Sequence, residues 1–411
     1  MPGVNKKAIK ISMNDILDHI NNQSTHIRLM LLAIRNDDSF KLFFSSSFTS
    51  NDDFLKFINL LLRFGLLPLI YKRLQKENLL EFFPEKIRDD FKKLYFIHIS
   101  KNLSLLYKIE EIYSILKTNG IEALIFKGPA SSMLAYNDPV LRVYSDLDLM
   151  ILPNDFDKTI YVLKKNGFNL PGIDKLKILN YIKKTFRDFT AHSENLFLDM
   201  HMQIAKGPVF FRLAYEQWED KQSFMINKTS CSTFSIEYYI LFLSIHCAKD
   251  GWSSLKTLVD LSQLLKINSD IDWNKLILAS KKFQAFHILK IALNFIIDFT
   301  GVFIPEEINK MILDCKKTQQ LYKKFYLRLF DNQFNLDIVT WYATIPKCLD
   351  TKLASYKFYW WFLTHPSPVL HPSLFKGPKI FYFLLPIFAP AFLIYKYKIL
   401  YYINRIFYNH R

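Results

Sequence analysis

A short run in which acidic and apolar residues alternate, Ser145–Leu152, constrains the fold of this chain more than any other segment. Residues two apart on a strand point to the same side, so Asp146 and Asp148 are expected to project together while the leucines between them face the core. Two carboxylates held so close repel each other unless a cation lies between them. Taken alone, the run is also compatible with an ordinary exposed polar face.

A second alternating run, 196–204, carries Asp199 and His201 on one face. If its strand pairs beside the first, a third carboxylate joins the other two, which is the usual frame for two-metal phosphoryl transfer. The sequence therefore predicts that Asp146, Asp148 and Asp199 are catalytic and bind Mg²⁺, with Mn²⁺ as the alternative ion. His201 either assists in this site or is a hydrogen-bonded histidine beside Asp199.

A short apolar run, 121–126, leads into Lys127, Gly128 and Pro129. The run is too short for a typical helix and predicts a buried strand, and proline at a first helical position predicts that a helix follows. Glycine at the mouth of a helix lets the backbone approach a phosphate, and a helix N-terminus favours anions. Lys127 and Gly128 are therefore predicted to bind the phosphates of a nucleoside triphosphate, although the tripeptide alone also suits a plain turn.

Arg142 lies four residues before Asp146. A guanidinium group suits a carboxylate, which it would hold in place, and equally a phosphate oxygen. Arg142 is therefore a candidate nucleotide-binding residue, with a surface ion pair as the alternative.

Helical periodicity returns after the strands, with an apolar stripe along 237–265 and a polar stripe beside it. The polar stripe consists of His246, Lys249, Ser253, Lys256 and Asp260. Either it closes over the nucleotide, with Lys249 and Lys256 on phosphates and His246 near the base or acceptor, or it is an ordinary solvated helix face. Gly251 is a candidate break in this helix.

The alternation of strands and helices indicates an α/β or α+β core with helical segments on both sides. We predict an N-terminal helical region at 1–115, the core at 116–225, a helical domain that closes the nucleotide site at 226–345, and an aromatic and basic tail at 346–411.

The composition indicates a globular or membrane-associated protein, since half of the residues are hydrophobic. Lysine and arginine exceed the acidic residues by 54 to 38, and the formal charge of +16 suits nucleotides, nucleic acid or an anionic membrane, or reflects many surface lysines. Four scattered cysteines argue against a zinc site or a disulfide framework. The first ten residues lack the apolar core of a signal peptide, so we expect a cytoplasmic protein.

The uncharged run Ile380–Tyr395 is flanked by lysines and interrupted by Pro386 and Pro390. It is shorter than the ~20 residues that a bilayer span needs. It is interpreted as a buried helical hairpin, an interfacial segment or a membrane span. The tail 376–411 is thus a candidate for peripheral contact with the inner face of a membrane, and its aromatic and basic residues also suit single-stranded RNA.

The order of these motifs resembles that of the uncharacterised nucleotidyltransferase family within the DNA polymerase beta nucleotidyltransferase superfamily. The resemblance spans roughly residues 50 to 270 and is carried by the segments 125–130, 136–139, 141–149, 198–201 and 246–261. The chain departs from the family pattern at Pro129, where the wider superfamily usually has serine, at Met202 in place of a tryptophan, and at Asp250 in place of a second histidine.

The resemblance implies an α+β fold with a polymerase-beta-like core, a mixed sheet with flanking helices, set between mainly helical N- and C-terminal regions. It implies that Gly128 begins the nucleotide-binding helix, that Asp146 and Asp148 bind metal, and that Asp199 is the third acidic residue. His246 and Asp260 lie in its last motif and are accessory candidates.

We therefore predict a magnesium-dependent nucleotidyltransferase that moves a nucleoside monophosphate from a nucleoside triphosphate to an acceptor hydroxyl and releases pyrophosphate. The acceptor is a protein, an RNA or a small molecule. The alternative is an attenuated nucleotide-binding or scaffold protein that associates with a membrane surface through its C-terminal tail.

Overall fold

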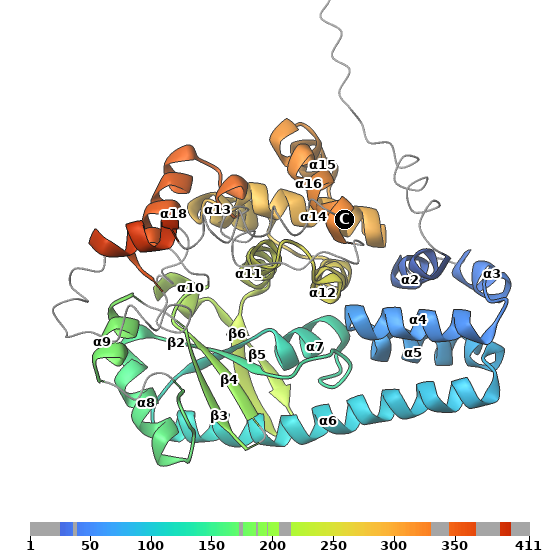
Figure 1. Ribbon diagram of the computed structural model, residues 1–411, viewed down its shortest axis with the longest axis horizontal. Coiled ribbons are helices and arrows are strands. Elements are labelled where there is room, and N and C mark those ends of the chain that lie inside the picture. Colours follow the sequence, from blue (N-terminus) through green and yellow to red (C-terminus); the bar gives the residue numbers. More distant parts are fainter. Residues whose placement is uncertain are drawn as a thin grey trace, which may run out of the picture.

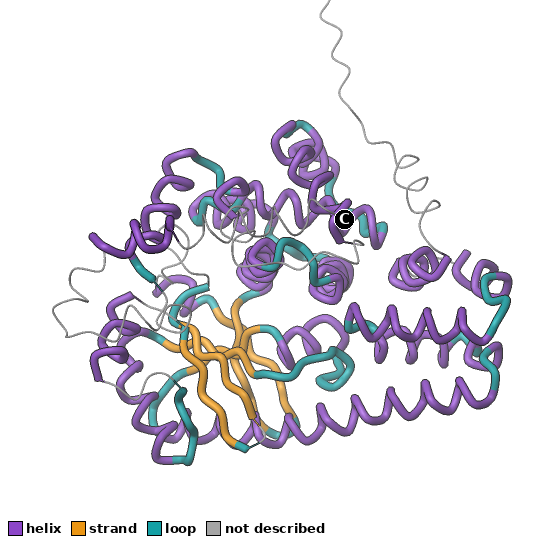
Figure 2. The backbone as a smooth tube through the Cα atoms, viewed as in Figure 1, coloured by secondary structure: helices purple, strands orange, loops and turns teal. Residues whose placement is uncertain are grey.

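A computed structural model gives the fold of the protein. The residues that it describes are 25–35, 39–171, 176–185, 188–194, 196–204, 215–329, 345–366 and 387–395. In these parts one sheet is set between an N-terminal and a C-terminal group of helices (Figures 1 and 2). This arrangement confirms the predicted α+β class. The expectation for the first ten residues lies outside the described residues, and so do 367–386 and 396–411 of the predicted tail.

Within the described residues the sheet has six strands in the order β3-β4-β2-β1-β6-β5. The strands are β1 (Ala123–Phe126), β2 (Leu147–Ile151), β3 (Phe189–Ser193), β4 (Leu196–His201), β5 (Lys221–Ile226) and β6 (Thr229–Phe234). β2 pairs with β4 and β1 pairs with β6 in parallel, and the other neighbours are antiparallel, so the sheet is mixed as predicted. All residues of β1 and β2 are buried, which explains their short, nearly continuous apolar sequences.

The strands β5 and β6 extend the sheet beyond residue 225, at which the predicted core domain ends. The helices between the strands are α7 (Gly128–Tyr136), α8 (Phe156–Lys165), α9 (Leu176–Thr185) and α10 (Tyr215–Glu219), with the short 3-10 helix η2 (Pro153–Asp155) before α8.

One long helix, α6 (Glu85–Thr118), runs along the sheet on the side away from the C-terminal helices, and the other N-terminal helices lie to one side of it (Figure 1). The others are α2 (Thr25–Arg35), α3 (Ser39–Ser46), α4 (Asn51–Phe64), α5 (Leu67–Lys76) and the 3-10 helix η1 (Leu79–Phe82). α4 shows why the boundaries fall where they do. Ser50 and Asp53 form a reciprocal capping box at its start, and Gly65 ends it in a left-handed conformation.

The C-terminal helices begin with α11 (Ile236–Lys249) and α12 (Leu255–Ile267), which lie over the end of the sheet from which α7 starts (Figure 1). The later ones are α13 (Trp273–Lys282), α14 (Phe286–Thr300), α15 (Glu306–Leu313), α16 (Lys316–Leu329), η3 (Ile345–Cys348) and α18 (Lys352–Thr364). Gly251 and Trp252 both have positive φ between α11 and α12, which confirms the predicted break. Among the described helices none is long and apolar enough to cross a membrane.

Candidate active site

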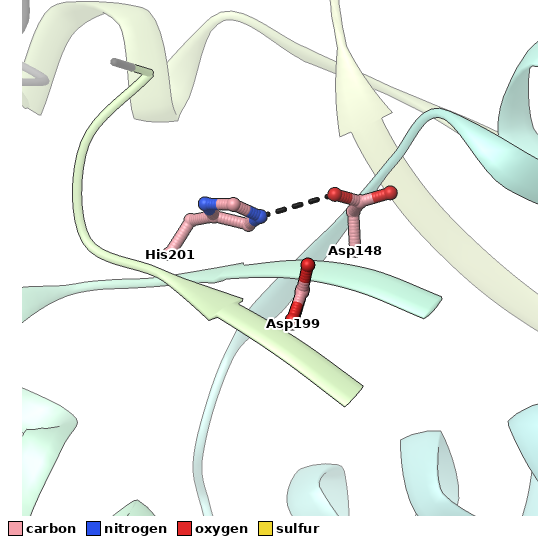
Figure 3. A group of neighbouring side chains, drawn as sticks. All are labelled: Asp148, Asp199 and His201. Carbon is pink, nitrogen blue, oxygen red and sulfur yellow. Dashed lines mark hydrogen bonds and ion pairs between the residues drawn. The ribbon is translucent and has the colours of Figure 1, made fainter. Parts of the chain in front are cut away.

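The parallel pairing of β2 with β4 places Asp148 directly beside Asp199. Because side chains alternate along a strand, His201 lies on the same face of β4 as Asp199. One ligand atom from each of Asp148, Asp199 and His201 lies within 4.8 Å of the other two (Figure 3). The two acids that the sequence placed on separate strands are thus brought together.

Asp146 lies next to this group without belonging to it. β2 begins at Leu147, so Asp146 belongs to the preceding bend and is half-buried. Burial raises the pKa of Asp199; His201 opposes this rise, while the carboxylates of Asp148 and Asp146 increase it. Asp146 is therefore close enough to repel Asp199, as a shared cation site requires.

Asp148 is held by two cationic donors. The Lys127 Nζ atom is 2.6 Å and the His201 Nε2 atom 3.1 Å from the same carboxylate oxygen, Oδ1. Burial alone would raise the pKa of Asp148, but Lys127 and His201 outweigh it and hold that pKa below its usual value. Asp148 is therefore ionised at neutral pH although its side chain is only 6% exposed.

His201 lies between two carboxylates, because its Nδ1 atom is 3.2 Å from Asp188 Oδ1. Burial lowers the pKa of His201, but Asp188 and Asp148 raise it to about 9. A histidine whose far nitrogen faces a carboxylate has a fixed ring orientation, as metal-site histidines commonly do. Asp188 was not predicted from the sequence; its only signal is its place immediately before β3.

The turn from β1 into α7 matches the predicted strand, turn and helix. Lys127 has φ 65° and ψ −154°, a region that is essentially reserved for glycine, so its backbone is strained. The Tyr239 hydroxyl accepts a hydrogen bond from the Lys127 N–H at 3.2 Å and lies 2.8 Å from Ser131 Oγ. Gly128, with φ 46°, begins α7 as predicted.

His246 on α11 faces the same turn. Its Nε2 atom is 3.5 Å from Lys127 Nζ and 3.2 Å from Asp250 Oδ2. Burial, together with the nearby Lys127 and Lys249, lowers the pKa of His246 well below its usual value, so the ring is neutral at pH 7. Lys249 is half-buried at the end of α11.

The structure places Arg142 and Asp260 in a separate cluster, which we call the buried clamp. The Arg142 Nε atom is paired with Asp260 Oδ2, and the Tyr136 hydroxyl donates a hydrogen bond to Asp260 Oδ1 at 2.8 Å. The two charged side chains are 6% and 2% exposed. Arg142 thus holds a carboxylate, which is one of the two predicted roles, but that carboxylate belongs to Asp260 on α12.

Lys256 braces the loop between the clamp and Asp146. Its ammonium donates a hydrogen bond to the Val143 carbonyl at 3.0 Å, and burial lowers its pKa to about 8. The Asn102 side chain donates to the carbonyls of Val140 and Arg142 in the same loop. Of the polar stripe of α11 and α12, Asp260 is therefore buried, His246, Lys249 and Lys256 are half-buried, and Ser253 is exposed to solvent.

A family model described as "Uncharacterised nucleotidyltransferase" matches residues 50–301 of the chain. That segment contains every residue of the site and of the buried clamp. No curated protein matches the chain.

Proposed function

Because the chain belongs to the uncharacterised nucleotidyltransferase family, we propose that it transfers a nucleoside monophosphate from a nucleoside triphosphate to an acceptor hydroxyl, releasing pyrophosphate. The parallel register that sets Asp148 beside Asp199, next to the start of α7, carries this proposal. The two carboxylates offer a site for cations, and the start of α7 beside them offers a site for phosphates.

Asp148 and Asp199, with Asp146 at the rim, would hold divalent cations. Their oxygen ligands fit Mg²⁺, or Mn²⁺ as the alternative, and Asp148 and Asp199 lie close enough together to share a cation. When bound, such cations neutralise the triphosphate and lower the pKa of the acceptor hydroxyl.

The chain's own residues supply binding and proton transfer. In this proposal Lys127, Lys249 and the backbone of Gly128 at the start of α7 bind the phosphates. The acceptor oxygen bonds to the α-phosphorus, the bond from that phosphorus to the bridging oxygen of pyrophosphate breaks, and Asp199 receives the acceptor proton. Arg142 and Lys256 keep the loop before Asp146 in place.

Calorimetric titration of the four nucleoside triphosphates in the presence of Mg²⁺ tests the proposal. We expect one of them to bind the wild-type protein and not the Asp146→Asn/Asp148→Asn variant. Asp157→Asn is the matched control, because its side chain is 71% exposed on α8. Equal binding to all three proteins would overturn the proposal.

A second candidate function, a scaffold on a membrane surface, is favoured by α18. This helix has no acidic residue, and Leu353, Tyr356 and Trp360 on its surface are 63, 69 and 67% exposed. Aromatic side chains beside lysines suit the headgroup region of an anionic bilayer. We propose on this basis a cytoplasmic protein that contacts the inner face of the membrane.

Flotation with anionic vesicles tests this contact. We expect the wild-type protein to float and the Tyr356→Ser/Trp360→Ser variant to stay at the bottom of the gradient. Phe303→Ser is the control, because Phe303 is 88% exposed in the loop between α14 and α15. A wild-type protein that does not float at low salt would dismiss the membrane contact.

A further inference from the structure

Six acidic and basic side chains form a continuous line through the candidate site. The order is Asp188, His201, Asp148, Lys127, His246 and Asp250. The successive contacts measure 3.2, 3.1, 2.6, 3.5 and 3.2 Å. Asp148 is near the centre. Its partner His201 contacts a further carboxylate, Asp188, through its other ring nitrogen, whereas Lys127 Nζ and Asp250 Oδ2 both approach the same nitrogen of His246, Nε2.

This arrangement matters because Oδ1 of Asp148 is already occupied. A divalent cation that binds this oxygen competes with His201 and with the closer ammonium of Lys127, which is only 12% exposed. A buried charge that loses its partner is costly unless another partner replaces it. The carboxylate of Asp250 lies 3.2 Å from the same His246 Nε2 atom that Lys127 Nζ approaches to 3.5 Å, so it lies where the displaced ammonium can be received.

The position of Asp250 argues against a purely structural role. It is the C-terminal capping residue of α11, where the partial negative charge of the helix end disfavours a carboxylate. Its side chain is 36% exposed, so it also contributes little apolar packing. Its contact with His246 is therefore the interaction that best explains an acid at this point.

We propose that Asp250, beside His246, offers the ammonium of Lys127 a second charged partner, so that the ammonium can move from Asp148 towards the phosphates when cation and nucleotide bind. The inference rests on the proposed function, since it concerns the same site. It makes Asp250 a positioning residue, one that contacts neither cation nor nucleotide.

A double-mutant cycle on Mn²⁺ binding without nucleotide tests this inference, with free Mn²⁺ followed by electron paramagnetic resonance. We expect Lys127→Met to bind Mn²⁺ more tightly than the wild type, because no ammonium has to be displaced. We expect Asp250→Asn to weaken binding about tenfold in the wild-type background and much less in the Lys127→Met background. Unfolding temperature should be unchanged in Asp250→Asn.

Lys249→Met is the matched control for charge, because it removes a lysine beside Asp250 that does not contact Asp148. The effect of Asp250→Asn should persist in full in that background. An equal effect of Asp250→Asn with and without Lys127 would overturn the inference and leave the proposed function standing. Absence of Mn²⁺ binding in both the wild type and Lys127→Met would overturn the two together.

Discussion

Asp148 and Asp260 are both buried and both paired with a cationic side chain, yet their surroundings differ in kind. Asp148 lies beside Asp199, whose pKa is raised, and its partners are a lysine and a histidine. Asp260 is paired with an arginine and accepts a hydrogen bond from Tyr136. The first group gathers acidic side chains on one face of the sheet. In the second group the arginine and the aspartate neutralise each other.

The choice of cation explains what each group can do. A lysine ammonium is a point charge on a flexible stem, so it can leave a carboxylate when a metal ion arrives. An arginine guanidinium is always charged and holds a carboxylate in a fixed geometry. The cluster around Asp148 is therefore suited to exchange of partners, and the buried clamp is suited to holding the loop that leads to Asp146.

The largest expected effect comes from Asp148→Asn. Loss of a charged ligand at the centre of the site should lower nucleotidyl transfer at least about 10³-fold, because stabilisation of the developing charge is lost. Some stability should be lost because Lys127 and His201 lose their shared carboxylate, but the fold should persist, since both keep a further neighbour, His246 and Asp188, and the repulsion between Asp148 and Asp199 is removed. Pyrophosphate release and thermal unfolding measure the two effects, and retention of full activity would contradict the assignment of the site.

Asp260→Asn should show the opposite pattern. It leaves the Arg142 guanidinium buried without its carboxylate, which should lower the free energy of unfolding by about 3 kcal/mol. Urea denaturation followed by circular dichroism measures this loss. Mn²⁺ affinity of the remaining folded protein should change little. A large loss of Mn²⁺ affinity with unchanged stability would mean that the buried clamp and the cluster around Asp148 are not independent.

Much of the site could be predicted because it depends on local patterns. Alternation along two segments was enough to predict that Asp148 and Asp199 lie on strands, and their parallel register confirms that these strands are neighbours. The glycine and proline after β1 likewise identified the start of α7. Such signals survive in a single sequence because strand and helix periods are short-range.

The rest could not be predicted because it depends on contacts between distant segments. Arg142 and Asp260 are 118 positions apart, and no local pattern indicates that they pair. Asp188 lies outside the alternation of β3, and the sequences of β5 and β6 are rich in polar residues and show little apolar alternation. The sheet's extension to residue 234 therefore appears only in the structure.

Lys256 contacts the loop between the buried clamp and Asp146, and its pKa leads to a prediction for the pH dependence of stability. Its pKa falls from 10.5 to about 8 in the folded protein because of burial, so between these values the unfolded chain binds more protons. Stability should therefore rise as pH increases from 8 toward 10.5, by roughly 2 kcal/mol after allowance for solvent screening. Urea denaturation of wild type and Lys256→Met across this range isolates the effect, and parallel pH profiles would show that Lys256 does not cause it.

The smallest expected effects come from removing one hydroxyl in each group, which makes a matched pair. In Tyr239→Phe the N–H of the strained Lys127 loses its acceptor, which should cost about 1 kcal/mol of stability. The same change should weaken nucleotide binding, because the turn that presents Lys127 and the start of α7 is then less well fixed. Tyr136→Phe removes a hydrogen bond to Asp260 and should lower stability by a similar or larger amount, about 1 to 2 kcal/mol. If the two groups are distinct, calorimetry will show a change in nucleotide affinity for Tyr239→Phe alone, and equal changes in both variants would mean that the clamp also sets the geometry of the phosphate site.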